Sequence, residues 1–199
     1  MKIIKFNKEL KKILTMVCII SFISISTSYA NIIENFNFKN ITIEDGLSQS
    51  TVKTIYQDSK GYIWVGTDAG LNKYNGYEFK QYKHDEYNKN SIANDYICDI
   101  AEDKNGYIWV STIGGLSRIN PDKDEIKNYY PEKDNGNLLD SNIWRILYTR
   151  EGKLIVFGIN GVNLYDEEKD TFNSIALKEN NLNTAVIYSE EVNFGLLQI

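Results

Sequence analysis

The chain contains very little cysteine and histidine, which excludes several kinds of functional site. Its 199 residues include two cysteines, Cys18 and Cys98, and one histidine, His84. Because Cys18 falls in a leader segment, the rest of the chain cannot form an internal disulfide and must be held by packing and strand pairing. A zinc site built from histidine and cysteine needs about four ligands, so it cannot be assembled. We therefore expect neither a metal nor a cofactor.

The same scarcity argues against catalysis. His84 lies in a polar connection, and the chain has no nucleophile-elbow sequence of the Gly-x-Ser-x-Gly type. Neighbouring carboxylates such as Glu167 and Glu168 fall in predicted turns, where charged side chains are usually solvated. We predict that the chain is not an enzyme.

Basic runs are absent beyond the first twelve residues. The formal net charge is −5, and it becomes −9 when the first 30 residues, with five lysines and one glutamate, are removed. An acidic chain of this kind lacks the lysine and arginine clusters that bind phosphate backbones, so nucleic acid is not an expected partner. Only two prolines and as many as 14 tyrosines are present, a composition that favours β-strands.

The chain also lacks a long apolar run. The longest, from Ile13 to Ile25, has about 13 residues, whereas a bilayer span needs roughly 20. It follows a lysine-rich start and leads to Ser28-Tyr29-Ala30, which fits a signal-peptidase site. We predict that residues 1–30 are a helical signal peptide and that the remainder is exported to the periplasmic or extracellular face; an uncleaved anchor is the alternative. Membrane contact is then expected only through this leader or through segments downstream of the 199 residues.

One string of residues recurs along the chain. Gly61-Tyr62-Ile63-Trp64-Val65-Gly66-Thr67 returns at Gly106 and, in altered form, at Gly152, with steps of 45 and 46 residues. A fixed period of this length is typical of repeat architectures. Within each repeat, turn residues separate four short apolar stretches, which is the pattern of a four-stranded propeller blade. The sequence therefore predicts an all-β fold, a partial β-propeller of about three blades arranged as an open arc.

The repeats divide the chain. We expect an orphan outer strand at residues 31–44, blades at 45–90, 91–136 and 137–181, and a degenerate or truncated start of a fourth blade at 182–199. Propellers usually have four to eight blades, so three cannot close a ring. The sequence thus suggests a fragment or truncated product of a longer protein, or a ring closed by other chains. Its uncovered blade faces predict poor stability or self-association.

The recurring residues are expected to be structural. Trp64 and Trp109 occupy matching places, which favours packing between blades over a stacking platform for a sugar. Asp58 and Asp103 lack the dense acidic spacing of a calcium loop, so we interpret them as turn caps. The glycines expected to form turns are Gly61, Gly106 and Gly152 before the second strand, and Gly70, Gly115 and Gly161 before the third.

A ligand site is expected where loops converge at one end of the blades. That end carries the linkers before each first strand and the turns after each second strand. The polar side chains there differ between blades and suit a carbohydrate or another small molecule. The candidate ligand-binding residues are Gln49, Asp68, Asn94, Asp95, Ser141 and Asn160.

The repeat string resembles a known family. Asp45-Gly46-Leu47-Ser48, then Ile55 to Thr67, then Gly70 to Gly76 and finally Phe79 are similar to the two-component regulator propeller repeat of bacterial membrane sensors. The likeness covers about residues 36–180; the third copy departs from it, with Ile155 in place of the tryptophan.

The resemblance implies more than the residues themselves. Such proteins carry blade arrays outside the membrane, then a small β-sandwich, a transmembrane helix and a cytoplasmic output, usually a histidine kinase and sometimes a diguanylate cyclase. None of these later parts falls within the 199 residues. Relatives sense carbohydrate fragments, often as dimers. The resemblance implies a non-catalytic, extracytoplasmic ligand-sensing segment; an exported polysaccharide-acting enzyme and a protein-interaction scaffold are the alternatives.

Overall fold

The structure of the chain is a computed structural model. It describes residues 12–13, 15–17, 38–131 and 138–176, and the backbone of four two-residue strands between 184 and 198. Residues 1–40 and 41–199 form separate units. The described residues of the leader, 12–13 and 15–17, are helical. Among the described residues, no helix has the length and apolar character that crossing a membrane requires. The predicted cleavage site at Ala30 lies outside the described residues.

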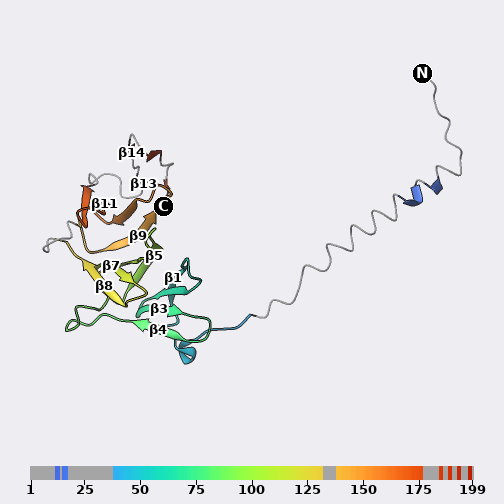
Figure 1. The fold of residues 1–199 in the computed structure, drawn as a ribbon, viewed down its shortest axis with the longest axis horizontal. Coiled ribbons are helices and arrows are strands. Elements are labelled where there is room, and N and C mark those ends of the chain that lie inside the picture. The colour runs from blue at the N-terminus through green and yellow to red at the C-terminus, as the bar shows by residue number, and fades with distance from the viewer. Residues whose placement is uncertain are drawn as a thin grey trace, which may run out of the picture. The chain divides into compact units, whose positions relative to one another are not determined.

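Three four-stranded antiparallel sheets dominate the unit 41–199 (Figure 1). In each sheet the spatial order of the strands is their order in the sequence, which is the meander of a propeller blade. The predicted all-β partial propeller is confirmed. The strands are β1 (Val52–Gln57), β2 (Ile63–Thr67), β3 (Gly70–Tyr74) and β4 (Phe79–Tyr82); β5 (Ile97–Glu102), β6 (Ile108–Thr112), β7 (Gly115–Asn120) and β8 (Glu125–Tyr129); and β9 (Ile143–Tyr148), β10 (Leu154–Gly158), β11 (Gly161–Asp166) and β12 (Thr171–Ala176).

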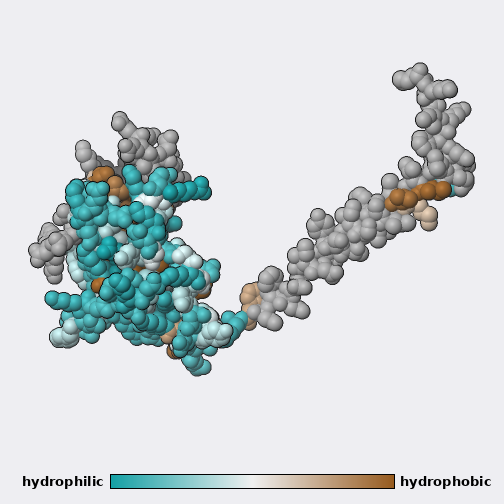
Figure 2. All heavy atoms as spheres, in the orientation of Figure 1, coloured by the Kyte–Doolittle hydropathy of each residue, from teal (hydrophilic) through white to brown (hydrophobic). Residues whose placement is uncertain are grey.

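The first strands of the three sheets, β1, β5 and β9, lie against one another. They are therefore the inner strands of the arc, and β4, β8 and β12 are the outer ones. We call the three sheets the first, second and third blade. The face that the view in Figure 2 presents is largely hydrophilic, because the large apolar side chains pack in the seams between neighbouring blades.

Each seam is built around a tryptophan. Trp64 of β2 packs among isoleucines of the second blade, and Trp109 of β6 packs among Ile143, Ile146 and Phe172 of the third. Both indoles have no exposed surface. Buried rings of this size contribute a large apolar area to packing, and neither indole offers an open face to a sugar.

A carboxylate in the preceding turn holds each indole. Asp58 accepts hydrogen bonds from Trp64 Nε1 at 2.8 Å and from the backbone N–H of Lys60 and Tyr62 at 3.0 and 2.9 Å. Asp103 accepts the equivalent bond from Trp109 Nε1 at 2.7 Å. Three donors on one carboxylate act as a turn cap rather than as a cation site.

The third blade lacks both members of this pair. Thr149 stands at the aspartate position and Ile155 at the tryptophan position, while Gly152 keeps the turn glycine. Thr149 Oγ1 still accepts a hydrogen bond from Lys153 N at 3.2 Å. The turn therefore survives with a hydroxyl cap, because there is no indole N–H left to satisfy.

The repeated glycines occupy two kinds of constrained position. Gly61, Gly106 and Gly152 have φ of +87°, +78° and +79°, a region that residues with a Cβ avoid. At the start of each third strand, the backbone approaches the outer strand closely. A Cβ there would come within 2.9, 2.9 and 2.2 Å of an outer-strand carbonyl oxygen at Gly70, Gly115 and Gly161, respectively.

The expected orphan strand at residues 31–44 needs correction. Residues 38–42 form no strand, and Ile43–Asp45 is a 3-10 helix, η1, capped by Thr42. The Thr42 side chain accepts from Glu44 N at 3.2 Å, and Asp45 accepts from Thr42 N at 2.9 Å. A strand needs a neighbour for its backbone hydrogen bonds, and no described sheet includes this segment. Residues 31–37 lie outside the described residues.

Beyond the third blade, the described backbone contains two small hairpin-like sheets instead of a fourth blade. β13 (Thr184–Ala185) pairs with β16 (Leu197–Gln198), and β14 (Tyr188–Ser189) pairs with β15 (Val192–Asn193). Each strand has two residues. The four-strand pattern of the blades is not repeated in this described part.

The carboxylate–indole pair predicts an energetic coupling. Asp103→Thr should lower the free energy of unfolding by about 2 kcal/mol, because it leaves the buried indole N–H without its acceptor. In a Trp109→Phe background, where no N–H remains, the same substitution should cost about 1 kcal/mol less. Urea unfolding of the four chains measures this. Strictly additive effects would contradict the coupling.

Candidate ligand-binding sites

The blades have two ends, which we name by their connections. The linker end carries the linkers before β1, β5 and β9 and the turns that follow β2, β6 and β10. The turn end carries the turns between first and second strands and the hairpins between third and fourth strands. All six sequence-predicted ligand residues lie at the linker end.

The linkers are anchored before they reach the linker end. Leu47, Ile92 and Leu138 are buried at equivalent places in the three blades. The next residue of each linker donates its backbone N–H to a buried polar side chain on the third strand. The donor–acceptor distance is 2.9 Å in every blade. The pairs are Ser48 to Asn72, Ala93 to Ser117 and Leu139 to Asn163.

The structure brings two of the predicted residues close together at the seam between the first and second blades. Gly70 N donates to Asp95 O at 2.8 Å, which ties the turn containing Asp68 to the linker of the second blade. Asp68 pairs with Lys53 at 3.3 Å. The carboxylate of Asp95 already accepts the backbone N–H of His84 at 2.7 Å.

Two of the other predicted residues serve local turns. Gln49 Oε1 and Asn94 Oδ1 accept backbone N–H groups two residues further along, at 2.5 and 2.9 Å. Asn160 is exposed and Ser141 is half-buried. None of the six residues lines a cavity that the structure describes. Their role in ligand binding stays a prediction.

Sequence reasoning missed three residues at this end. Lys53, Cys98 and Trp144 each lie at a register irregularity, at the same place on the first strand of each blade. A β-bulge redirects a side chain and is common beside functional sites. No signal in a single strand marks these positions, because register is set by the pairing of two strands. Burial, with the neighbouring Asp99 charge, raises the pKa of the Cys98 thiol to about 11, so this thiol is not a reactive nucleophile.

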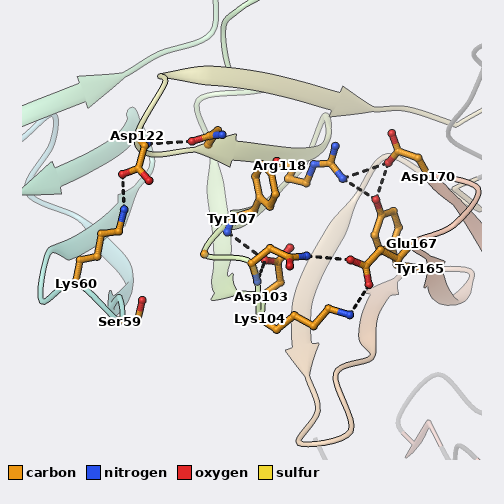
Figure 3. A pocket seen from close by; sticks show the side chains of 13 residues that line it. Ser59, Lys60, Asp103, Lys104, Tyr107, Arg118, Asp122, Tyr165, Glu167 and Asp170 are labelled. Carbon is orange, nitrogen blue, oxygen red and sulfur yellow. Dashed lines mark hydrogen bonds and ion pairs between the residues drawn. The ribbon is translucent and has the colours of Figure 1, made fainter.

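The large described cavity lies at the other end. It has a volume of about 770 Å³ and spans all three blades at the turn end, within the size range of small-molecule sites. We call it the seam cavity, and Figure 3 shows the side chains of its walls. Ser59 and Lys60 come from the first blade, Asp103 to Tyr107, Arg118, Asn120 and Asp122 from the second, and Tyr165, Glu167 and Asp170 from the third.

The charges of the seam cavity are paired with each other. Lys60 bonds to Asp122 across the first seam. Lys104 Nζ lies 2.7 Å from Glu167 Oε2 across the second, and Arg118 lies 3.3 Å from Asp170. Each cation thus has an acidic partner on another blade. The walls offer both donors and acceptors without a strong field of one sign.

Arg118 is held by aromatic rings. Its guanidinium lies over the rings of Tyr107, Trp109 and Tyr129, at 4.9, 5.4 and 5.8 Å from their centroids. It also donates to Tyr165 Oη at 2.6 Å. Cation–π contacts and a hydrogen bond together fix this side chain as a rigid part of the wall.

Asp170 is the hub of the second seam. Tyr129 and Tyr165 donate their hydroxyls to Asp170 Oδ1 at 2.6 Å each, and Lys127 bonds to the other oxygen. Partial burial acts to raise the pKa of Asp170, but these three hydrogen bonds together outweigh it and hold the pKa at about 2. Burial, with the hydrogen bond to this carboxylate, raises the pKa of Tyr165 to about 12.

The described residues hold no catalytic constellation that we recognise. No group of three or more His, Cys, Asp or Glu among them is arranged to hold a metal. His84 uses Nδ1 for a contact of 2.7 Å with Ile92 O. The cavity has no histidine or cysteine in its walls, and its carboxylates are engaged in hydrogen bonds or ion pairs.

Comparison with known families addresses the repeats directly. The family described as two component regulator propeller matches residues 46–69 and 91–114. Both segments run from a buried linker to the turn after the second strand. The first two repeats of this chain match the two-component regulator propeller family. Each matched segment contains the Asp–Trp pair that organises its seam.

Relatives of these two-component regulator propeller repeats are much longer proteins. Histidine kinase P4 of Formosa agariphila is 47% identical over 77 residues, which cover 39% of this chain and 6% of the kinase. The extracellular domain of BT3049 from B. thetaiotaomicron, assigned as a hybrid two component system, is 26% identical with a TM-score of 0.63. The match covers 69% of this chain but only 20% of that domain.

An enzyme shares the fold. Virginiamycin B lyase from Staphylococcus aureus has a TM-score of 0.53 at 16% identity, over 69% of this chain and 45% of the lyase. At an identity this low, the likeness shows a shared propeller architecture but not a shared activity. The more similar proteins are a histidine kinase and an extracellular domain of a signalling system.

Asp170 predicts a pH dependence of stability. Its folded pKa of about 2 lies below the usual value of 3.8, so its contribution is present above about pH 4 and is lost as the pH falls toward 2. The side chain is 35% exposed, so we expect only about 1 kcal/mol after solvent screening. Between about pH 5 and pH 2.5, the free energy of unfolding should fall in both proteins. The fall should be about 1 kcal/mol smaller in Asp170→Asn than in the wild type.

The control for this experiment is Asp122→Asn. Asp122 lines the same cavity, but its side chain is 67% exposed, so its substitution should leave the wild-type profile unchanged. Identical pH profiles for the wild type and Asp170→Asn would show that the seam does not depend on this carboxylate.

Proposed function

We propose that the chain is a non-catalytic, extracytoplasmic ligand-sensing segment of a bacterial two-component receptor. The observation that carries the proposal is the likeness to the extracellular domain of BT3049, at 26% identity over 69% of the chain. The identity of 47% to a histidine kinase over 77 residues supports it independently. The lysine-rich, apolar leader supports export.

Two places are candidates for the ligand. The linker end carries the six predicted residues, but the side chains of Gln49 and Asn94 already serve local turns. The seam cavity is the stronger candidate, because its volume of about 770 Å³ suits a small ligand. Its position across three blades also means that a ligand there contacts every described blade, so binding favours one arrangement of the blades over another.

The paired charges of the seam cavity point to a neutral, polyhydroxylated ligand. Hydroxyl groups both donate and accept, so they fit walls where ammonium and carboxylate groups alternate. A strongly charged ligand would have to break an existing ion pair between blades. We therefore assign short neutral oligosaccharides as the ligand class.

Titration calorimetry of the full chain tests this function, with neutral oligosaccharides and uronic-acid oligosaccharides as probes. We expect binding of a neutral probe and none of the acidic ones. Lys60→Ala and Asn105→Ala should each weaken that binding roughly tenfold, since loss of one hydrogen-bonding partner costs about 1–2 kcal/mol. Both side chains line the cavity and are exposed, so the fold should be kept.

Two further sets of variants locate the site. Asn94→Ala and Asn160→Ala at the linker end should bind as the wild type does, and so should Lys89→Ala, an exposed residue that lines no described cavity. Weakening by the linker-end variants alone would move the site to the end that the sequence predicted. Absence of binding by every neutral probe would contradict the assigned ligand class.

A further inference from the structure

A second cavity adjoins the seam cavity at the turn end of the second seam, between the second and third blades. It has a volume of about 460 Å³, and we call it the side pocket. Its walls include the second-blade turn at residues 103–105 and, from the third blade, Tyr148, Gly152 and Glu167. The residues that line both cavities are Asp103, Lys104, Asn105, Tyr165 and Glu167. The two cavities are therefore neighbours that share a wall.

Glu167 forms the partition in that shared wall. Its carboxylate reaches across the second seam (Figure 3), where Oε1 accepts from Asn105 Nδ2 at 2.9 Å and Oε2 lies 2.7 Å from Lys104 Nζ. The side chains of Lys104 and Glu167 are both more than half exposed, and exposed ion pairs contribute little to stability. A ligand that offers its own hydroxyl groups to Lys104 and Asn105 can therefore displace this carboxylate at little cost.

The first seam is closed at the equivalent place. Ser59 donates its backbone N–H and its hydroxyl to the carboxylate of Glu102, at 2.7 and 2.6 Å. Glu102 is the last residue of β5, and strand pairing puts Tyr148 at the same position of β9. Lys104 follows the turn aspartate of the second blade as Ser59 follows that of the first. In the second seam Lys104 bonds to Glu167 instead, which leaves Tyr148 without the contact that its counterpart makes.

The hydroxyl of Tyr148 is buried and, within the described part of the chain, has no hydrogen-bond partner. It lies beside Gly152, where an added Cβ would be 3.4 Å from the hydroxyl oxygen, and both residues line the side pocket. A buried polar group left unpaired costs free energy, so this hydroxyl calls for a partner from outside the chain. A water molecule takes up only about 30 Å³. The pocket therefore has room for a much larger hydroxyl-bearing group.

The walls of the side pocket carry charges of both signs. Lys104 and Lys153 lie among them, together with Glu167 and Glu168. Walls of this kind suit hydroxyl groups, which both donate and accept hydrogen bonds. A charged ligand would meet a group of its own sign here, as it would in the seam cavity. Both cavities therefore favour the same chemical class of ligand.

We propose that the side pocket is a second subsite, which binds further sugar units of a neutral oligosaccharide whose first units occupy the seam cavity. Tyr148 donates its otherwise unpaired hydroxyl to these further units, and Glu167 is the partition that a long ligand displaces. This inference rests on the proposed function, because it extends the same ligand beyond the same cavity. Its consequence is that the chain selects its ligand by length as well as by charge.

Titration calorimetry of the full chain tests the length dependence, with neutral glucan, xylan and mannan oligosaccharides of two to six sugar units as probes. In the series that binds, the affinity should rise at least about tenfold from the shortest to the longest member, because the longer ligand gains hydrogen bonds in the second subsite. An affinity that does not depend on length would overturn the second subsite alone. Absence of binding by every probe would overturn the proposed ligand class as well.

Tyr148→Phe removes only the unpaired hydroxyl. Urea unfolding should give a free energy of unfolding no lower than that of the wild type, because no bond within the chain is lost. Affinity for the longest oligosaccharide should fall roughly three- to tenfold, the equivalent of one hydrogen bond, and affinity for the shortest should be unchanged.

The matched control is Tyr74→Phe. The Tyr74 hydroxyl donates to Gly76 O at 2.7 Å in a first-blade hairpin, and Tyr74 lines no described cavity. This variant should bind oligosaccharides of every length as the wild type does. A loss of stability in Tyr148→Phe with unchanged binding of the longest probe would show that a bound water, and not a sugar, satisfies the hydroxyl, and would overturn the proposal.

Glu167→Gln tests the partition. It removes the charge that pairs with Lys104 but keeps the size of the side chain and an oxygen to accept from Asn105. The ratio of long-ligand to short-ligand affinity should rise about twofold or more, because the ion pair that the long ligand displaces is gone. Glu125→Gln, at an exposed residue that lines no described cavity, should keep the wild-type ratio. An unchanged or lower ratio in Glu167→Gln would contradict the role of Glu167 as the partition.

Discussion

The hydrogen bond between a turn carboxylate and a buried indole is the interaction on which the other features depend. It links the turn before the second strand to the ring that fills the seam, in the first blade at 2.8 Å and in the second at 2.7 Å. A tryptophan is favourable in a dry seam only when its N–H has an acceptor there. The repeat string meets this requirement, because it places the aspartate, the turn glycine and the tryptophan at a fixed spacing in the sequence.

The seams also explain why the proposed ligand site lies at the turn end. Apolar packing fills the middle of each seam, so polar groups are left at the turn end, where the hairpins of one blade reach the turns of another. Arg118 and Asp170 bond to each other across the second seam and also line the wall of the seam cavity. A ligand in this cavity and the contact between blades therefore share side chains. This is the property that a sensor needs, because binding then changes the energy of the arrangement.

Several features were readable in the sequence because they depend on local spacing. The four strands of each blade follow from apolar stretches between turn residues, and the positive φ at Gly61, Gly106 and Gly152 follows from tight turns in which a Cβ is unfavourable. The outer strand expected before the first blade was wrong in its described part, because Thr42 and Asp45 cap a 3-10 helix there. The bulges at Lys53, Cys98 and Trp144 were invisible, because register is a property of two strands and not of one.

The sequence by itself determined the repeat and the all-β architecture, since each depends on residue type and spacing along the chain. Only the tertiary structure decided which residues meet across a seam. Lys104 and Glu167 are 2.7 Å apart in space but belong to different blades, and Ile55 and Ile100 are the same residue type at equivalent positions with opposite exposure. Contacts between distant segments depend on how the blades pack, and that packing alone creates the seam cavity and the ion pairs between blades.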